Sequence, residues 1–511
     1  MSALKNINEA SLTLAEVTVQ LGGRRLSEVE LASLAEIRIL QKLSLPELCE
    51  LTFTDQFEPG ASISYLVAGL SLEVQRQGQT IFSGEVTALE YGYEPDRGQT
   101  LRVRGYSLLH RLRKRQPVRM FVQVGLRDLA QELIKDLGVT LEGTGSETVW
   151  RRVLQHGQND LDLLRERANA SGVYFSLWGT TLQLLTLEGK GEPVPLALGQ
   201  TLLEARVELN GDSCCRSVSA QGWNPFIVRP NQGKADQARL TRTIPANIPP
   251  ARFEESGEQF LVSCSLENDR AADALAQARL DAQVAREVTL WGVAVGNVKL
   301  RPGAIIEVSE LVPALNGRYV VTEAMHCFTP ERGFVTEIST CPPPTTPQNK
   351  SVTAILGKIS NVTDPENLGR VQATLPACND LETDWMQVVC AGAGAGKGLS
   401  MLPDVGDLVL IVCLDGDFSQ GIVIGGLYGS DAGADNGVDD GHRRRFAMRT
   451  AGGHSIQFDD TNKVFRLEDS SGNVLELKPG KLRIESKGDM EIAAPGQSIV
   501  IRGRAINFEE G

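Results

Sequence analysis

The last sixty residues consist of short alternating segments, and these limit the possible folds more than any other part of the chain. In "GNVLELKPGKLRIESKGDMEIAAPGQSIVIRG", residues 472–503, apolar residues stand one position apart and Gly or Pro soon ends each run. Alternation directs each apolar pair to one face of a strand and charged residues such as Arg466 and Glu476 to the other. Each strand can therefore bury only one face. Seven such pairs follow residue 450: Ile456/Phe458, Phe465/Leu467, Leu475/Leu477, Leu482/Ile484, Met490/Ile492, Ile499/Ile501 and Ile506/Phe508.

One copy of this segment is too short to cover its own apolar faces. A single-chain solenoid needs about three such strands per coil, so seven strands give little more than two coils, fewer than the ~3 repeats that a continuous core requires. If three chains wind together, each layer receives an apolar pair from every chain and the shaft has no open edge. We therefore predict a trimeric β-helix over residues 446–511. Its core is expected to contain Leu475, Leu477, Leu482, Ile484, Met490, Ile492, Ile499 and Ile501.

Length and charge exclude several other classes of protein. The chain has 511 residues, too many for one core. Its net charge of -13, from 51 Lys and Arg against 64 Asp and Glu, argues against nucleic acid as the main partner. There is no apolar run of membrane-spanning length, and the N-terminus "MSALKNINEASL" does not have the pattern of a signal peptide. We expect synthesis in the cytoplasm without a signal peptide.

The remainder of the chain has the pattern of a mainly β protein with several domains. Segments such as "SLEVQRQGQTIFSGEVTALEYGY" alternate around turn residues, which indicates antiparallel strands. "GLRDLAQELIKDLGV" and the run after Asn159 have helical spacing, with Asn159 as the expected N-cap of the second helix. A third helix is expected from Asn268 to about Arg286. The predicted divisions are a first β domain (1–110), an α+β insert (111–200), a second β domain (201–341), a Pro-rich linker (342–351), an OB-type barrel (352–430) and a flexible bridge (431–445).

The sequence contains no convincing catalytic or cofactor motif. "AGAGAGKGLS" lacks the first Gly and the final Ser or Thr of a P-loop, and Gln457 replaces the closing Gly that a nucleophile elbow around Ser455 would need. Five histidines and nine scattered cysteines lack metal-ligand spacing. We predict no catalytic residue, no cofactor and no metal. The basic run "HRLRKRQPVR", residues 110–119, is interpreted as a solvated face or a protein contact.

Three stretches resemble one known family over nearly the whole chain. The most specific is "GKISNVTDPENLGRVQATLP" followed by Trp385 and "MLPDVGDLVLIVCLDGDFSQGIVIGGLY". "VRGYSLLHRLRKRQPVRMF" with "LRDLAQELIKDLGV", and "LRPGAIIEV" with "GRYVVTEAMHCFTPERGFVTEI", are similar to segments of the same family. The family is that of VgrG-type spike proteins of contractile injection systems, which are related to phage tail hub and spike proteins. The compact length looks most like extracellular, phage-tail-like particles.

The resemblance implies a structural, non-enzymatic role. It implies two hub β-barrels at 1–110 and 201–341, an OB-fold, and a homotrimer that joins an inner tube protein and baseplate proteins to a membrane-piercing needle. A PAAR-type tip protein would cap the needle near Ile506 and Phe508, and a cargo effector is a further candidate partner. Assembly is expected in the bacterial cytoplasm, within a particle that is either retained or released. A spike-associated cell-wall hydrolase, which would degrade peptidoglycan, is the alternative hypothesis.

Overall fold

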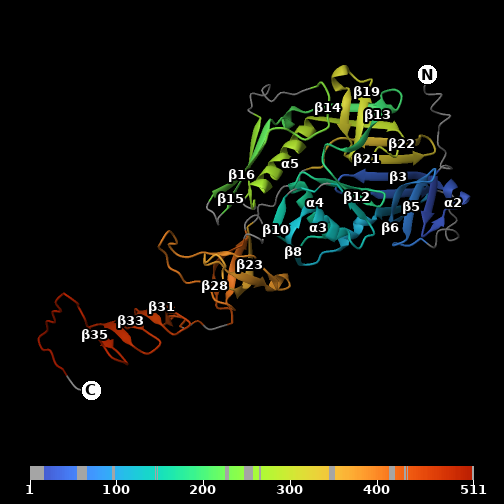
Figure 1. Cartoon of the computed structure of the whole chain (residues 1–511). Coiled ribbons are helices and arrows are strands. Elements are labelled where there is room, and N and C mark those ends of the chain that lie inside the picture. The colour runs from blue at the N-terminus through green and yellow to red at the C-terminus, as the bar shows by residue number, and fades with distance from the viewer. Residues whose placement is uncertain are drawn as a thin grey trace. The chain divides into compact units, whose positions relative to one another are not determined.

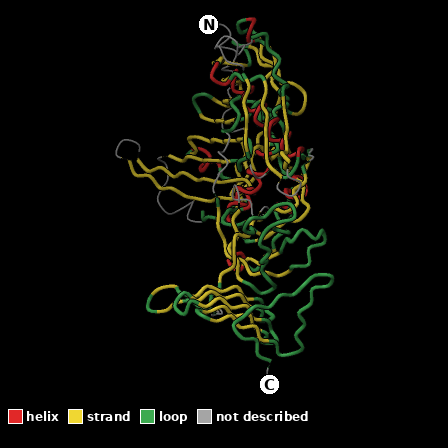
Figure 2. Tube along the Cα trace, turned by 90° about the vertical axis from the view of Figure 1, so that its left-hand side faces the viewer, coloured by secondary structure: helices red, strands yellow, loops and turns green. Residues whose placement is uncertain are grey.

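The computed structural model describes residues 17–508, except for 55–65, 95–97, 144, 147, 225–228, 247–256, 264–265, 345–351, 414–420, 431–432 and 434. The fold is mainly β (Figure 1 and Figure 2). The chain divides into two compact units, residues 1–425 and 426–511. Within the described ranges, no helix is both long and apolar enough to cross a membrane. Most of the predicted linker, residues 342–351, lies outside the described residues.

An 11-stranded sheet forms the centre of the first unit. β3 pairs antiparallel with β21, and Ile39 lies opposite His326 at that junction. The segments predicted as two hub barrels, 1–110 and 201–341, therefore share one sheet. The closure of either segment into a barrel stays a prediction. In spatial order the strands are β14 (Leu202–Leu209), β18 (Val288–Val295), β22 (Gly333–Ser339), β21 (Glu323–Thr329), β3 (Leu34–Lys42), β4 (Leu48–Thr54), β7 (Gly98–Ser107), β6 (Gln79–Glu94), β5 (Ser71–Arg76), β1 (Val17–Leu21) and β2 (Arg24–Arg25).

Alternation along these strands explains the hub core. In β4 the inward positions Cys49, Leu51 and Phe53 are buried, while the residues between them are half-buried. Phe328 of β21 and Phe334 of β22 join the same apolar cluster, and their rings stack with centroids 4.1 Å apart. The second hub segment therefore contributes side chains to the core of the first. The short helix α2 (Glu28–Ala32) begins with a capping box between Ser27 and Glu30.

The insert is a small α+β layer with its own core. α3 (Leu126–Ile134) and α4 (Asp160–Ala170) pack on an antiparallel pair of strands, β8 (Arg119–Gly125) and β10 (Val149–Gln155). The predicted cap of α4 is confirmed, because Asn159 Oδ1 accepts a hydrogen bond from the Asp162 amide at 2.9 Å. The remaining strands of the insert are β9 (Thr140–Glu142), β11 (Tyr174–Trp178) and β12 (Thr181–Leu185).

The second hub segment carries two further small sheets. The long helix α5 (Asp269–Glu287) confirms the predicted helix, and Asn268 caps it through a bond from the Ala271 amide. Its buried alanines pack on one of these sheets. The strands are β13 (Lys190–Ala197), β19 (Ala304–Ser309) and β20 (Gly317–Val320) in one sheet, and β16 (Arg229–Ala235), β15 (Ser217–Asn224) and β17 (Glu258–Val262) in the other. Short 3-10 turns are η2 (Leu108–Lys114), η3 (Gly211–Ser213), η5 (Pro313–Leu315) and η6 (Pro376–Cys378).

The residues predicted as an OB-type barrel form a six-stranded sheet. Its closed core includes Ile359 of β23, Val409 and Ile411 of β27, and Val423 of β28, all almost completely buried. In spatial order the strands are β25 (Leu381–Glu382), β24 (Gln372–Leu375), β23 (Thr353–Asn361), β27 (Leu408–Cys413), β28 (Gly421–Leu427) and β26 (Gln387–Val388).

The C-terminal unit is an antiparallel meander of short strands, labelled β31, β33 and β35 in Figure 1. Its five strands are β31 (Arg445–Arg449), β32 (Ser455–Asp459), β33 (Val464–Glu468), β34 (Val474–Lys478) and β35 (Lys481–Glu485). The predicted bridge, residues 431–445, contains a two-stranded hairpin of β29 (Val438–Asp439) and β30 (His442–Arg443). Arg445 closes this hairpin region with an ion pair to Asp435 at 2.6 Å.

Candidate functional site

The register of the C-terminal sheet lines up the apolar pairs in two columns, which we call the apolar ladder. Directly opposed residues lie on the same face of a sheet, so each column continues from strand to strand. One column is Met448, Ile456, Leu467, Leu475 and Ile484, and the other is Phe446, Phe458, Phe465, Leu477 and Leu482. The sequence pattern had identified four of these five pairs. Phe446 and Met448 have the same spacing but stand within an arginine-rich run, and they were missed.

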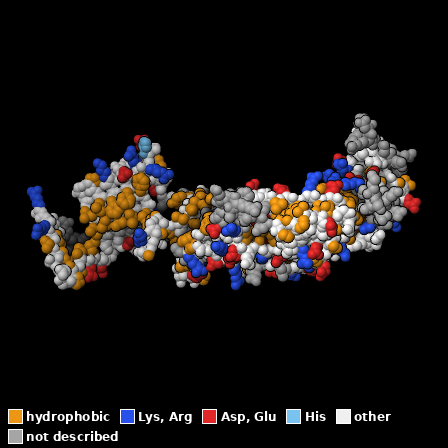
Figure 3. Space-filling view, turned by 90° about the horizontal axis from the view of Figure 1, so that it is seen from above, with side chains coloured by type: hydrophobic (Ala, Val, Ile, Leu, Met, Phe, Trp, Pro, Cys, Tyr) orange, Lys and Arg blue, Asp and Glu red, His pale blue; other side chains and the backbone are white. Residues whose placement is uncertain are grey.

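In the single chain the apolar ladder is open to solvent. Leu482 is 62% exposed and Ile484 is 60% exposed, whereas Leu475 is half-buried. Figure 3 shows hydrophobic side chains gathered in a broad patch over this unit, at the left of the view. A contiguous apolar face of this kind marks a contact surface in soluble proteins. The structure brings Leu475, Leu477, Leu482 and Ile484 together as predicted neighbours, while their burial in a trimer stays a prediction.

The opposite face of the same sheet carries a set of ion pairs around the buried side chain of Glu476. Arg466 Nη1 lies 3.6 Å from a carboxylate oxygen of Glu476, and Lys478 Nζ lies 3.1 Å from the other. The hydrogen bond from Lys478 is the main cause that lowers the pKa of Glu476 below its ordinary value. Arg466 Nε also contacts Glu468 at 3.1 Å. The sheet thus has one face suited to water and one suited to burial.

The last three apolar pairs do not form strands in the single chain. Met490, Ile492, Ile499 and Ile501 lie after β35 in segments without regular secondary structure. All four are exposed, and Ile501 is 63% exposed. The sequence predicted short strands here, but the isolated chain does not form them. No strand among the described residues pairs with these segments. The predicted tip residues Ile506 and Phe508 are also exposed, Phe508 by 93%.

The OB domain presents a second uncovered apolar surface. In β27 both the inward and the outward positions are apolar, and outward-facing Leu410 lies opposite outward-facing Leu356 of β23. Leu356 and Ile424 are exposed, and Leu410 is half-buried. Strands that are apolar on both faces are typical of sheets covered on both sides. The outward face of these strands is therefore a second candidate contact surface.

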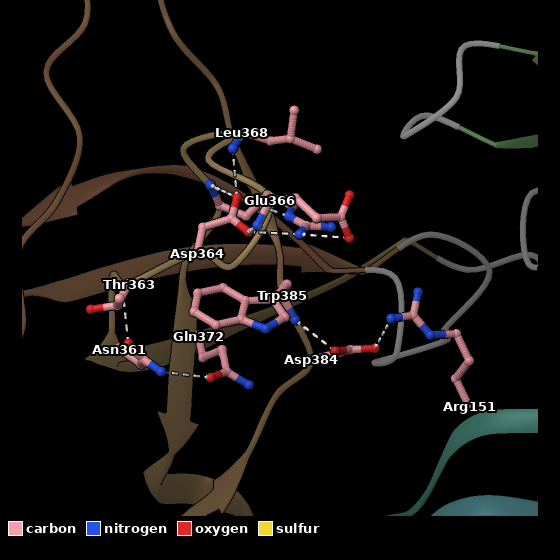
Figure 4. A network of polar contacts seen from close by, with 10 residues as sticks. Arg151, Asn361, Thr363, Asp364, Glu366, Leu368, Gln372, Asp384 and Trp385 are labelled. Carbon is pink, nitrogen blue, oxygen red and sulfur yellow. Dashed lines mark hydrogen bonds and ion pairs between the residues drawn. The ribbon is translucent and has the colours of Figure 1, made fainter.

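A buried ion pair shapes the loop between β23 and β24 (Figure 4). Arg370 binds Asp364 through two hydrogen bonds, Nη2 to Oδ1 at 2.6 Å and Nε to Oδ2 at 3.0 Å. Asp364 also accepts bonds from the amides of Glu366 and Leu368, at 3.1 and 2.9 Å. The Arg370 guanidinium, followed by these amides, holds the pKa of Asp364 well below its usual range. Both residues stand in the segment "GKISNVTDPENLGRVQATLP" that carries the family resemblance, but the resemblance did not assign them this structural role.

The residues considered for catalysis do not form an active site in the structure. Ser455 begins β32 beside exposed His454, and a strand rather than a helix follows. The glycine-rich segment 391–400 forms exposed turns. His326 is fully buried, its Nδ1 lies 3.0 Å from Thr336 Oγ1, and burial lowers its pKa to about 4. Among the described residues, no group of three or more His, Cys, Asp or Glu side chains could hold a metal ion.

The basic run is exposed at Arg111, Arg113 and Lys114, as expected of a solvated face, but several of its arginines also contact residues of their own chain. Arg111 pairs with Glu85, Arg113 lies 5.0 Å from the centre of the Tyr106 ring, and Arg119 binds Asp160 at 2.7 Å. The short turn η2 carries Arg111 and Arg113, whereas Arg119 begins β8 and reaches Asp160 at the start of α4. The run is therefore not evidence for an external anionic partner.

Two family models match the sequence. Residues 355–428 match the type VI secretion system/phage-baseplate injector OB domain. Residues 11–329 match the Alg8 N-terminal domain. No curated protein sequence matches the chain. The chain thus carries an injector-type OB domain behind a hub segment of the Alg8 type.

Solved structures share the fold at low sequence identity. The Francisella PdpA–VgrG complex in its half-lidded form has a TM-score of 0.58 at 10% identity, covering 92% of this chain and 88% of that one. The E. coli c3393 protein, a type VI secretion system component similar to bacteriophage T4 gp27 and gp5, has a TM-score of 0.52 at 11% identity, with 77% and 96% covered. The 43 kDa tail protein of prophage MuSo2 from Shewanella oneidensis has a TM-score of 0.50 at 16% identity, with 64% and 98% covered.

These solved structures share the fold of this chain, and the family model identifies residues 355–428 as an injector-type OB domain. The predicted relation to VgrG-type and phage tail proteins is confirmed at the level of fold. Because the Alg8 N-terminal domain model spans more than half of the 511 residues, the chain belongs to the Alg8 N-terminal domain family.

Proposed function

We propose that the protein is the central hub and spike of a contractile injection system and acts as a homotrimer. The hub and OB domain would join an inner tube and baseplate to a needle formed by residues 446–511. The needle would transmit the force of contraction to a target membrane, with no chemical step in this chain. The observation that carries the proposal is the apolar ladder, which is built in register and left uncovered by its own chain.

The magnitude of ladder burial is sufficient to drive assembly. Full burial of a Leu, Ile, Phe or Met side chain is worth roughly 1.5–3 kcal/mol. With about 1 kcal/mol for each of the ten ladder positions, to allow for those already half-buried, each chain gains about 10 kcal/mol. The loss of free motion on association costs about 4–15 kcal/mol. Three chains would gain about 30 kcal/mol in total, against about 8–30 kcal/mol for the two association steps, so ladder burial covers the cost of forming a trimer.

The two-faced ladder favours assembly of more than one chain, and the number three is taken from the resemblance to VgrG-type spikes. A ladder with one dry and one charged face cannot form the inside of a closed shaft alone, whereas several such sheets can meet with their dry faces inward. The outward face of β23 and β27 would lie between OB domains in the same trimer. PdpA–VgrG is itself a complex, and this favours further partners for the hub, including baseplate proteins, a cargo effector and a PAAR-type tip protein near Ile506 and Phe508.

The test is the solution mass of the purified chain and of two neighbouring variants. Leu482→Asp places a carboxylate in the ladder, and Arg483→Asp places one on the charged face of the same strand. In a monomer both positions are exposed, so both variants would behave alike. In the trimer, Leu482→Asp buries three unpaired charges, and we expect loss of the trimer by light scattering, while Arg483→Asp keeps it. A monomeric wild-type chain, or equal behaviour of the two variants, would overturn the proposal.

A further inference from the structure

The strand pair β8–β10 of the insert contacts the OB domain directly. Arg151 Nη2 lies 3.0 Å from Asp384 Oδ2, as Figure 4 shows. Arg152 Nη1 donates a hydrogen bond to the carbonyl oxygen of Glu382 at 2.7 Å. Two consecutive residues of β10 therefore reach the same short segment, 381–386, of the OB domain. Arg152 and Glu382 are 230 positions apart in the sequence.

Apolar side chains extend the contact beyond the two arginines. Val118, just before β8, and Leu154 of β10 both pack against the buried core of the OB domain. Because Arg151 is half exposed, its ion pair alone would contribute little. Burial of apolar area stabilises a contact more than an exposed ion pair does, so Val118 and Leu154 supply most of the stability. The arginines fix the orientation of the two surfaces through directional hydrogen bonds.

The OB side of this contact is held firmly in its own domain. The Thr383 amide donates to the Ala373 carbonyl at 2.8 Å, and Thr383 Oγ1 accepts from the Ala373 amide at 3.0 Å. Asp384 also accepts a bond from the Trp385 amide at 2.9 Å. The segment that receives the arginines therefore cannot shift without disturbing β24.

The insert is also fixed to both hub segments. The Ser44 amide donates to the Phe175 carbonyl at 2.7 Å, which joins the insert to the first hub segment. Trp178 Nε1 donates to the Pro302 carbonyl at 3.2 Å, which joins it to the second. A displacement of the hub is thus passed to the insert and, through β10, to the OB domain.

We propose that the β8–β10 pair is a second, non-covalent attachment between hub and OB domain, with Arg151 and Arg152 as positioning residues. The covalent attachment is the Pro-rich segment 342–351. A single linker does not prevent the domain that follows it from rotating about the linker. The second attachment removes that freedom. Its role in force transmission rests on the proposed function, but the attachment itself can be tested without it.

The experiment cuts the covalent attachment and asks whether the non-covalent one holds. A site-specific protease sequence replaces residues 345–350 of the full chain, and the two fragments are separated by size after cleavage. We expect the wild-type fragments to stay together. In Arg151→Glu/Arg152→Glu, repulsion from Asp384 and loss of the Glu382 bond should speed their dissociation at least fivefold. Arg165→Glu, which removes a surface pair with Asp162 on α4, is the matched control and should dissociate like the wild type.

A charge exchange separates positioning from simple damage to the fold. Asp384→Arg added to Arg151→Glu restores an opposite pair, and it should slow dissociation again relative to Arg151→Glu alone. Wild-type fragments that separate at once, or Arg151→Glu/Arg152→Glu fragments that stay together, would overturn the attachment. Light scattering on the uncut chain reports the trimer independently, so failure of the attachment and failure of the proposed spike are distinguished.

Discussion

Two strands of nearly equal length show how differently the OB domain and the C-terminal sheet complete their cores. β27, with the sequence LVLIVC, buries Val409 and Ile411 within its own chain. β34, with the sequence VLELK, leaves Leu475 half-buried and Leu477 exposed. Both patterns indicate a strand with at least one dry face. The alternating pattern therefore determines which face of a strand is dry, but it does not determine whether the same chain or another molecule covers that face.

The most severe test of this comparison lies beyond the ladder, at Ile501. Ile501→Asp should abolish the trimeric shaft, because three carboxylates in one dry layer cost several kcal/mol each when unpaired. The loss of the trimer would be measured by light scattering and by thermal melting of the full chain. Trimer melting that stays unchanged would contradict the inward assignment of Ile501, and the prediction of a β-helix would then apply to residues 446–485 alone.

A substitution in the hub core should lower a melting temperature that, unlike that of the trimeric shaft, does not depend on protein concentration. Phe53→Ala removes a fully buried ring from the hub core and should lower the free energy of unfolding by about 3–5 kcal/mol. Since Phe53 packs within its own chain, the lowered melting temperature of the hub should not depend on protein concentration, unlike that of the shaft. Calorimetry over a hundredfold dilution checks this. A concentration-dependent hub transition would show that the hub core also needs a partner.

Acid should weaken the hub through His326. Burial lowers its pKa to about 4 in the folded chain, against about 6.5 in the unfolded one, so the unfolded state binds the extra proton between these values. The neutral side chain therefore contributes stability above pH 6.5 that is lost as the pH falls to 4, up to about 3 kcal/mol at 1.36 kcal/mol per pKa unit.

The variant His326→Gln isolates that contribution. Denaturant unfolding of the hub should show a shallower fall between pH 6.5 and 4 than in the wild-type chain, even if the variant is less stable overall. An identical slope in both proteins would assign the acid sensitivity to other groups.

The sequence predicted the mainly β fold, the helix cap at Asn159, the helix that starts at Asn268, and the two-sided pattern of the C-terminal strands because each depends on local spacing. It did not predict that β3 and β21 join the hub segments, since that pairing brings together residues nearly 300 positions apart. Nor did it predict the pairing of Arg111 with Glu85 or of Arg119 with Asp160, because the composition of a charged run says nothing about where its partners lie.

The sequence predicted the type of candidate site, an apolar strand face, but not all of its residues. Residues from Leu475 to Ile484 were found from their alternation, and the ladder register confirms that they share a face. Phe446 and Met448 were hidden by neighbouring arginines, although a search for apolar residues at i and i+2 would have included them. The attachment through Arg151 and Asp384 had no sequence signal, since neither residue stands in a periodic pattern.

Because the strands of the ladder are regularly spaced, the length of the needle should depend on the number of strands. Adjacent strands of a sheet lie about 4.8 Å apart, so each additional short strand would lengthen the shaft by that step and supply its own apolar pair. A duplication of one hairpin would add two steps without changing any existing contact. Reach towards a target surface could then be adjusted in evolution or by design through strand number, independently of the hub.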